Sequence, residues 1–147
     1  MRIALFALTI VLAGVSYGEV ISTQLSGPLA AFRSVGEDIA ITPDGKLAVY
    51  RAQQADDDAT ALYSVPTTGG EAPTRLNSIN SSANNIIEFG ITPDGETVIY
   101  RGRQDSELSE LYAVPIAGGG EPVKLTGPLV SGGVGVAGFQ ITADSKH

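Results

Sequence analysis

A five-residue motif returns at a constant interval and constrains what this chain can fold into. Residues 41–45 read Ile-Thr-Pro-Asp-Gly, residues 91–95 repeat the same five letters, and residues 141–145 read Ile-Thr-Ala-Asp-Ser. The interval is 50 residues both times. Repeats of about 20–50 residues are typical of solenoids, propellers and other arrays. The sequence therefore indicates an architecture much more strongly than it indicates a chemistry.

The repeated pattern continues well beyond the pentapeptide. Two further hydrophobic segments, a Gly-Gly pair and a Gly-Pro-Leu segment also recur. The aligned pairs are 47–51 with 97–101, 62–66 with 111–115, 69–70 with 118–119, 74–77 with 123–126, and 24–29 with 124–129. The chain therefore contains the tail of one unit, two whole units, and the beginning of another.

Each unit is expected to contain four strands. In Thr-Pro-Asp-Gly, proline presets φ, aspartate tolerates the next turn position and glycine accepts positive φ, which together favour a tight hairpin. Proline cannot donate into a strand ladder, so Pro66 and Pro115 should end the third strands. No apolar period of 3.6 residues persists over ten residues beyond the N-terminal segment, so the class is all-β. The expected strands are 38–42, 46–52, 61–66 and 74–77, then 87–92, 96–102, 110–115 and 122–126, with 136–142 opening the last unit.

The second strand of each unit is apolar on both faces. Leu47 and Val49 point to one side, while Ala48 and Tyr50 point to the other. A strand of this kind must be covered on both sides. A blade of a β-propeller meets this demand, because each blade lies between two neighbours.

The order of these elements resembles the TolB-like β-propeller repeat. That repeat has a Ser/Thr-Pro-Asp-Gly turn, a hydrophobic strand, a Leu/Ile-Tyr strand, a Gly-Gly turn and a Leu-Thr segment. The first unit carries them as 42–45, 47–50, 62–63, 69–70 and 76–77, and the second as 92–95, 98–100, 111–112, 118–119 and 125–126. The third copy departs from the pattern, with Ala143 for proline and Ser145 for glycine. The resemblance implies four-stranded propeller blades and a role such as that of an envelope scaffold contacting other proteins.

The number of units is small for a propeller. Residues 19–147 hold about 2.6 repeats, with complete blades at about 36–77 and 86–126 and another beginning at about 136. Propellers usually have about 4–8 blades. The sequence therefore predicts an incomplete propeller. We favour a fragment or truncated product, while association of two or three copies and a short open array are alternatives.

The N-terminus reads as a signal peptide over residues 1–18. Met1-Arg2 is a short positive region, residues 3–15 are apolar but short for a membrane span, and Ser16 and Gly18 are small residues at the −3 and −1 positions. A buried N-terminal strand or an uncleaved anchor is the alternative. The sequence has no cysteine to staple an exported chain. We expect a periplasmic or secreted protein that meets a membrane only through this segment.

The charge excludes some partners. The formal net charge is −7, and removal of residues 1–18 takes away Arg2, leaving 8 Lys and Arg against 16 Asp and Glu. Nucleic acids and anionic membrane surfaces favour basic patches, so neither is expected as a partner. The acidity is otherwise that of a soluble surface.

Two motifs resemble enzyme signatures only in their letters. Residues 14–18 match G-x-S-x-G, but they lie in the predicted signal peptide, and the only histidine is His147. Residues 133–138 match G-x-G-x-x-G, but they lead into a predicted strand rather than into a helix. We therefore expect no catalytic residue, no cofactor and no metal ligand.

The remaining candidates are an acidic loop and a polar connection. Asp56, Asp57 and Asp58, with Glu107 and Glu110 in the equivalent loop, could ligate calcium, but the alternating spacing of a calcium loop is missing and a solvated tip is favoured. The polar connection comprises Asn77, Ser78, Asn80, Ser81, Ser82, Asn84 and Asn85, which suit a solvated loop able to bind a partner.

Repeated tyrosines and arginines form the last group. Tyr50 with Tyr100, Tyr63 with Tyr112, and Arg51 with Arg101 hold the same positions in the two units. Such repetition favours a structural role, with tyrosine rings between blades and hydroxyl groups at the rim. Ligand binding by these side chains is the alternative.

These observations favour an exported, non-enzymatic propeller module that binds an envelope or extracellular protein, with self-association through open blade faces as a further possibility. Two alternatives stay open. The chain could be the propeller part of an exported peptidase or glycan-processing enzyme whose catalytic domain lies beyond His147, or it could be a carbohydrate-binding propeller.

Overall fold

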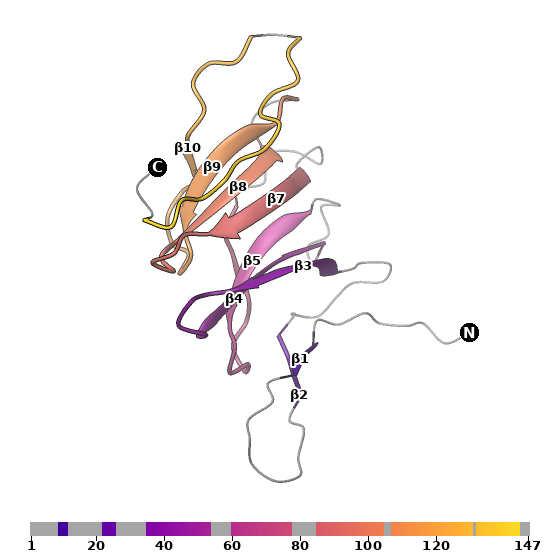
Figure 1. Cartoon of the computed structure of the whole chain (residues 1–147). Helices are drawn as coiled ribbons and strands as arrows, with labels where there is room; N and C mark the ends of the chain where they lie inside the picture. Colours follow the sequence, from indigo (N-terminus) through magenta and orange to yellow (C-terminus); the bar gives the residue numbers. More distant parts are fainter. Residues whose placement is uncertain are drawn as a thin grey trace, which may run out of the picture.

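The structure is a computed structural model of the 147-residue chain. It describes residues 9–11, 22–25, 35–53, 60–77, 85–104, 107–130 and 132–144. Within these ranges the fold is all-β (Figure 1). The same ranges contain no helix that is long and apolar enough to cross a membrane.

Two four-stranded antiparallel sheets make up most of the molecule. Sheet 1 has the strand order β3-β4-β5-β6, and sheet 2 has the order β7-β8-β9-β10. A short pair, β1 with β2, precedes them. The bounds are β1 (Thr9–Val11), β2 (Ser22–Gln24), β3 (Val35–Ile41), β4 (Leu47–Ala52), β5 (Ala61–Pro66), β6 (Thr74–Arg75), β7 (Asn85–Ile91), β8 (Thr97–Arg103), β9 (Glu110–Pro115) and β10 (Val123–Lys124).

The strand registers of the two sheets are equivalent. Tyr50 pairs with Tyr63 in sheet 1, and Tyr100 pairs with Tyr112 in sheet 2. Each first strand also has a register shift near its start, between 35 and 39 in β3 and between 86 and 88 in β7. Because the bulge recurs with the ladder, it belongs to the repeated pattern.

The strands predicted for the two whole units are confirmed. The third strands 61–66 and 110–115 coincide with β5 and β9, and both end at the predicted proline. The first strands begin earlier than expected, at 35 and 85, and the fourth strands have only two residues each. The predicted strand 136–142 is not formed, and within the described ranges no strand pairs with these residues in a ladder.

Each sheet has two unlike faces. We call one the tyrosine face; it carries Tyr50 and Tyr63 in sheet 1 and Tyr100 and Tyr112 in sheet 2. We call the other the arginine face; it carries Arg51 and Leu62 in sheet 1 and Arg101 and Leu111 in sheet 2. These assignments follow from the registers, since paired residues point to the same side of a sheet.

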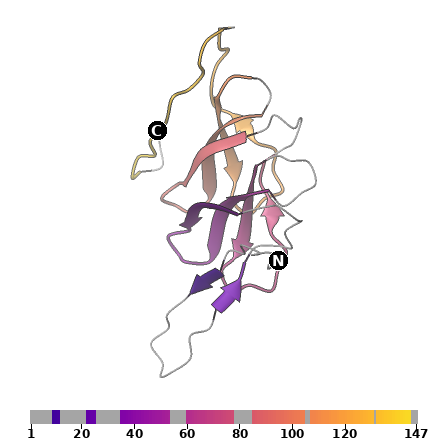
Figure 2. The ribbon, with the colours of Figure 1, turned by 90° about the vertical axis from the view of Figure 1, so that its right-hand side faces the viewer.

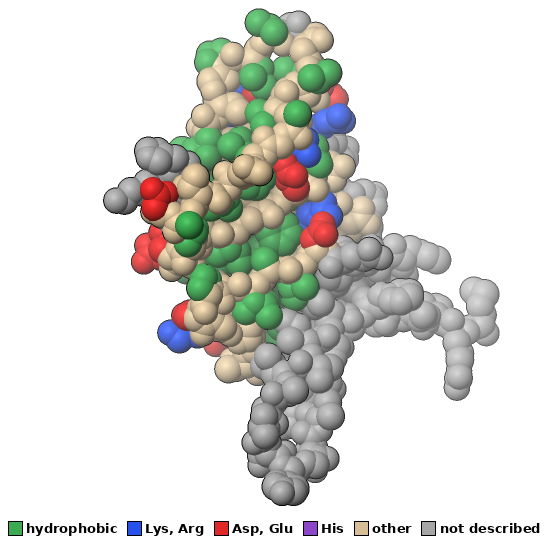
Figure 3. Space-filling model, in the orientation of Figure 1, with side chains coloured by type: hydrophobic (Ala, Val, Ile, Leu, Met, Phe, Trp, Pro, Cys, Tyr) green, Lys and Arg blue, Asp and Glu red, His purple; other side chains and the backbone are tan. Residues whose placement is uncertain are grey.

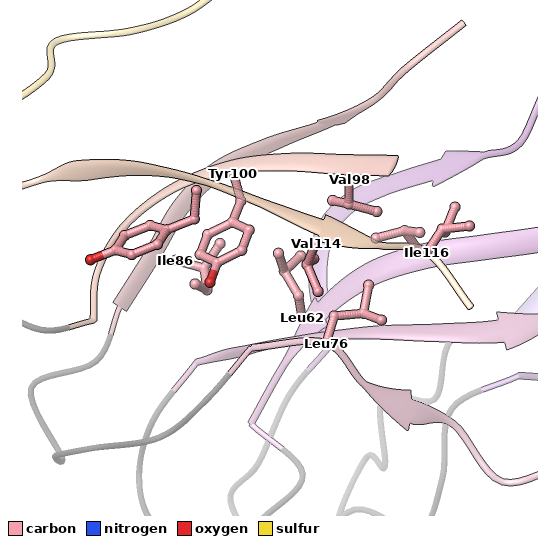
Figure 4. Packing of buried hydrophobic residues seen from close by; sticks show 9 residues of the cluster. Leu62, Leu76, Ile86, Val98, Tyr100, Val114 and Ile116 are labelled. Atoms are coloured by element: carbon pink, nitrogen blue, oxygen red, sulfur yellow. The ribbon is translucent and has the colours of Figure 1, made fainter. Parts of the chain in front are cut away.

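The main core lies between the arginine face of sheet 1 and the tyrosine face of sheet 2. Figure 4 shows Leu62 and Leu76 of the first unit directed toward side chains of the second. A fully buried aliphatic side chain contributes about 1.5–3 kcal/mol, so this contact is the chief source of cohesion between the sheets. Its buried members are Val49, Leu62, Leu76, Ile86, Val98, Tyr100, Tyr112, Val114 and Ile116.

A second core covers the β4 and β5 part of the tyrosine face of sheet 1. Leu25, directly after β2, is 2% exposed and packs there with Tyr50, Tyr63 and Val65. Figures 1 and 2 show the resulting succession of β1–β2, sheet 1, sheet 2 and the C-terminal segment. All but two residues of β4 are fully buried, as its apolar faces predicted, whereas burial in β8 alternates along the strand.

Candidate binding surface at the hairpin turns

The repeated pentapeptide builds the turn between the first two strands of each sheet. In the first copy, the Gly45 amide donates to the Thr42 carbonyl at 2.8 Å, and the Thr42 amide donates to the Leu47 carbonyl at 2.9 Å. Gly45 has φ 75°, as does Gly95 in the second copy. Only glycine adopts this conformation without a steric cost, so the predicted role of these glycines is confirmed.

The threonine and aspartate of the motif hold the turn together. The Thr42 hydroxyl donates to Asp44 Oδ1 at 2.7 Å, and the Lys46 amide donates to the same oxygen at 3.1 Å. These bonds, with that from Thr42 the most important, lower the pKa of Asp44 from 3.8 to about 2. The equivalent bond from Thr92 lowers the pKa of Asp94.

The third copy keeps part of this arrangement despite its altered letters. The Thr142 hydroxyl donates to Asp144 Oδ1 at 2.7 Å, as in the other two copies. Ala143 has replaced the proline, but the Thr–Asp pair does not depend on it. The threonine and the aspartate are thus the most persistent part of the motif.

A hollow of about 620 Å³ opens at this end of the sheets. The turn of sheet 1, the β5–β6 connection and the turn of sheet 2 surround it. The Thr67 hydroxyl donates to the Gly45 carbonyl at 2.7 Å and fastens two of its walls together. Its lining residues are Thr42, Asp44, Gly45, Lys46, Leu47, Pro66, Thr67, Thr68 and Gly95.

Exposed charge lies at the rim of this hollow. Lys46 Nζ is 3.1 Å from Asp44 Oδ2, and the two side chains are 80% and 53% exposed. Such an exposed pair contributes little to stability. Together with the hydroxyl of Thr68 and the apolar Leu47 and Pro66, this pair gives the hollow a mixed polar and apolar surface.

The repeated arginines join each sheet to the segment that follows it. Arg51 Nη1 donates to the carbonyl oxygens of Ile86 and Ile87 at 3.0 and 2.6 Å, while Nη2 pairs with Asp38 in its own sheet. Hydrogen bonds to a charged donor are among the stronger ones in proteins. The structural role predicted for Arg51 is thereby explained by a contact between sheets.

Arg101 repeats this contact 50 residues later. Its Nη1 donates to the Val136 carbonyl at 3.1 Å, and its Nε donates to Glu88 Oε1 at 2.7 Å. The Val136 amide donates to the Ser109 carbonyl at 2.7 Å. Residues from 135 onward therefore meet sheet 2 at the position where β7 meets sheet 1.

The repeated tyrosines are buried structural residues. Tyr50 and Tyr63 stack with ring centroids 5.8 Å apart, and Tyr100 and Tyr112 stack at 5.2 Å. The Tyr100 hydroxyl donates to Gln104 Oε1 at 2.6 Å. The rings of Tyr100 and Tyr112 lie between packed layers as expected, but the expectation that their hydroxyl groups lie at the rim is wrong, because both hydroxyl groups are hydrogen-bonded inside the core.

Glu110 is the one carboxylate among these core residues. It is 2% exposed, accepts a hydrogen bond from the Tyr112 hydroxyl at 2.9 Å, and pairs with Lys124. Sheet 1 has Ala61 in the place of Glu110 and Arg75 in the place of Lys124. The sequence signal for this site is a charge that appears in one unit only, although the nearby Glu107 makes Glu110 look like part of an acidic loop.

The structure does not bring the calcium candidates together. Asp56, Asp57 and Asp58 lie outside the described residues, Glu107 is exposed, and Glu110 is engaged by Tyr112 and Lys124. In the described ranges, no three His, Cys, Asp or Glu side chains form a group that could hold a metal ion.

The other sequence candidates are placed as follows. Gly135, within the glycine-rich 133–138, forms a single parallel bridge with Ser109, and no helix follows it as far as residue 144. Asn77 is buried, and its Oδ1 accepts a hydrogen bond from the Leu62 amide at 2.9 Å. Residues 78–84, 14–18 and His147 lie outside the described residues.

Known proteins give no further guidance. Comparisons with models of protein families, with curated proteins and with solved structures find no match to this chain.

Proposed function

We propose that this chain is an exported, non-enzymatic β-propeller module of the TolB-like repeat type. In this proposal, sheets 1 and 2 are two blades. Their turn end binds another protein of the cell envelope. Residues 1–18 would direct the chain to the periplasm or the exterior.

The repeated inter-sheet contact is the observation that carries the proposal. Arg51 reaches the carbonyl groups of Ile86 and Ile87, and Arg101 reaches that of Val136, so the same step joins each layer to the next. A chain of four-stranded sheets related by one repeated step is the architecture of a propeller. The arginine face of sheet 1 against the tyrosine face of sheet 2 would be the standard contact between blades.

The turn end is the part of this module best suited to binding. Loops on a rigid scaffold commonly carry function, because they can vary while the strands hold them in place. The turn of sheet 1, which lines the hollow, is held by two hydrogen bonds: one from Thr42 to Asp44 within the turn, and one from Thr67 of the β5–β6 connection to Gly45. Lys46 and Thr68 are exposed at its rim and are free to meet a partner surface without disturbing the core.

Position-specific photocrosslinking in the producing cell tests this function. A photoreactive residue would replace Thr68 at the rim of the hollow or, as the control, Val134, which is 89% exposed and lies outside its lining. We expect one envelope protein to be captured from Thr68 and not from Val134.

A second step makes the result quantitative. The captured protein would be purified and titrated against the chain, with Lys46→Glu expected to raise the dissociation constant about tenfold or more, or about 1.4 kcal/mol. Equal crosslinking from both positions would contradict the proposed surface, as would hydrolysis of a peptide or glycan by the purified chain for the non-enzymatic role.

A further inference from the structure

The two ends of the stack are each covered over one half only. At the first end, the tyrosine face of sheet 1 is closed on its β5 side, where Tyr63 and Val65 are buried with Leu25. On its β3 side, Ile39 and Ile41 stay 38% and 43% exposed. Large hydrophobic side chains in an open row indicate an unfilled contact.

At the second end the covered and open halves are exchanged. The β7 side of the arginine face of sheet 2 is covered, since Ile141 and Phe139 lie against Gly90. The β10 side is open, with Val123 at 61% and Leu125 at 49% exposure. Figure 3 shows hydrophobic side chains reaching the surface between charged groups.

The contact inside the molecule shows what both ends look like when filled. Leu76, equivalent to Leu125, is 3% exposed in the core between the sheets. Phe89 and Ile91, equivalent to Ile39 and Ile41, are partly buried against the same core. Leu125, Ile39 and Ile41 therefore have more covered counterparts in the middle, whereas Thr74, equivalent to Val123, is exposed.

The two half-covers lie on complementary halves of the two end faces. The segment 135–142 packs on sheet 2 where the first strand of a following sheet would lie. In the same way, β2 and Leu25 pack on sheet 1 where the last strand of a preceding sheet would lie. If the second end of one copy meets the first end of another, the two segments lie in the same layer at opposite sides. Leu125 and Ile41 would then be covered.

We infer that two copies of this chain associate head to tail into a closed ring, in which each junction is a composite layer built from residues 135–142 of one copy and residues 22–25 of the other. This inference rests on the propeller architecture proposed above. Each copy contributes two sheets and one shared layer, which gives about six layers for two copies and about nine for three. Only the pair falls within the usual range of about 4–8 blades. A head-to-tail contact forms a ring when its rotation closes.

The mass of the full chain in solution tests the stoichiometry. Light scattering after size-exclusion chromatography should give twice the mass of one chain, which is 15.1 kDa when residues 1–18 are retained. Leu125→Asp and Ile41→Asp, each at an end position about half exposed in the single chain, should both reduce the mass to that of one chain. Val134→Asp, at a loop position 89% exposed, should leave the pair intact.

Mixing the two variants tests the head-to-tail geometry. A Leu125→Asp copy still has a native first end, and an Ile41→Asp copy still has a native second end. The mixture should recover a heterodimer through the one native junction, although neither variant pairs alone. A contact between two identical ends would instead be lost with one variant and unaffected by the other.

Several outcomes would overturn the inference. They are a wild-type mass of one chain at all concentrations tested, a ladder of larger species, a dimer that survives Ile41→Asp, and no recovery on mixing. Circular dichroism of each variant separates a lost contact from a lost fold. Because the crosslinking from Thr68 does not depend on pairing, failure of the dimer and failure of the proposed binding role remain distinguishable.

Discussion

Leu76 and Leu125 hold the same position in successive sheets, yet Leu76 is 3% exposed and Leu125 is 49% exposed. Each follows the last strand of its sheet, and each main-chain amide donates to an equivalent carbonyl, that of Leu62 at 2.9 Å or that of Leu111 at 2.8 Å. The difference lies in what is stacked above them. Leu76 faces sheet 2, whereas no described sheet covers Leu125.

This pair gives a matched test of the core. Leu76→Ala should lower the free energy of unfolding by about 2–5 kcal/mol, because it removes buried methyl groups and leaves a cavity. Leu125→Ala should cost less than about 1 kcal/mol in chains kept dissociated at low concentration. Urea unfolding followed by tyrosine fluorescence measures both. Equal losses would contradict the position of Leu76 between the sheets.

Replacement of Arg51 by lysine tests the contact between the sheets. Lysine keeps the charge but cannot bond two carbonyl groups and Asp38 at once, since it lacks the planar fork of arginine. We expect Arg51→Lys to cost about 1.5–3 kcal/mol of stability. Arg103→Lys, at an exposed position at the end of β8, is the comparison and should cost less than Arg51→Lys. A neutral Arg51→Lys would refute the contact.

The turn predicts a pH dependence with a defined sign. The pKa of Asp44 is lower in the folded chain than in the unfolded chain. The stability that the Asp44 carboxylate contributes is therefore complete at pH values above 3.8 and is lost as the pH falls toward about 2. Thr42→Val removes the hydrogen bond that contributes most to the shift, and should return the Asp44 pKa toward 3.8. Thr92→Val should leave the Asp44 pKa unchanged and should raise that of Asp94.

NMR titration of the side-chain carboxyl carbons measures these values site by site. The stability difference between the wild type and Thr42→Val should be larger at pH 5 than at pH 2. An Asp44 pKa that stays near 2 in Thr42→Val would show that another group holds the carboxylate.

Two neighbouring glycines separate backbone strain from packing. Gly118 and Gly119 have φ of 76° and 79°, but a methyl group on Gly118 would lie 2.5 Å from Thr74 Cγ2, whereas one on Gly119 meets nothing within 4 Å. Both alanine variants should lose about 1–2 kcal/mol from the backbone conformation. Gly118→Ala should lose more stability than Gly119→Ala, because its methyl group would clash with Thr74 of sheet 1.

Thermal unfolding compares the two variants, and Thr74→Ala provides the control. In the double variant Thr74→Ala/Gly118→Ala, the extra loss of stability that Gly118→Ala shows over Gly119→Ala should largely disappear, because Thr74→Ala removes the clashing methyl group. A double-mutant cycle with no coupling would mean that this glycine does not approach sheet 1.

Local physics explains what could be read in advance. Pro66 and Pro115 lack an amide hydrogen, Gly45 and Gly95 accept positive φ, and apolar letters on both faces of 47–52 require cover. These properties depend on a few adjacent residues, so the turns, the strands and the all-β class were predictable. The same pattern predicts a strand over 136–142, where the structure has none. The pattern describes one segment only, whereas a strand also needs a neighbouring segment with which to form hydrogen bonds.

The hollow and the Glu110 site could not be predicted in this way. The walls of the hollow come from residues about 20 to 50 positions apart, and Glu110 is buried because Tyr112 and Lys124 converge on it. Its carboxylate in the sequence suggested an exposed loop, since unpaired buried charges are costly. Only its partners in space make the burial tolerable.

The sequence by itself determined the repeated unit, its turns and its four-stranded pattern, because each depends on backbone conformation and side-chain alternation over short distances. The tertiary structure decided which of two equivalent residues is buried, as with Leu76 and Leu125, and where Arg51 and Arg101 reach. Burial depends on what is stacked against a surface. Equivalent residues therefore have different environments when a neighbouring sheet covers the whole face of one sheet but not of the other.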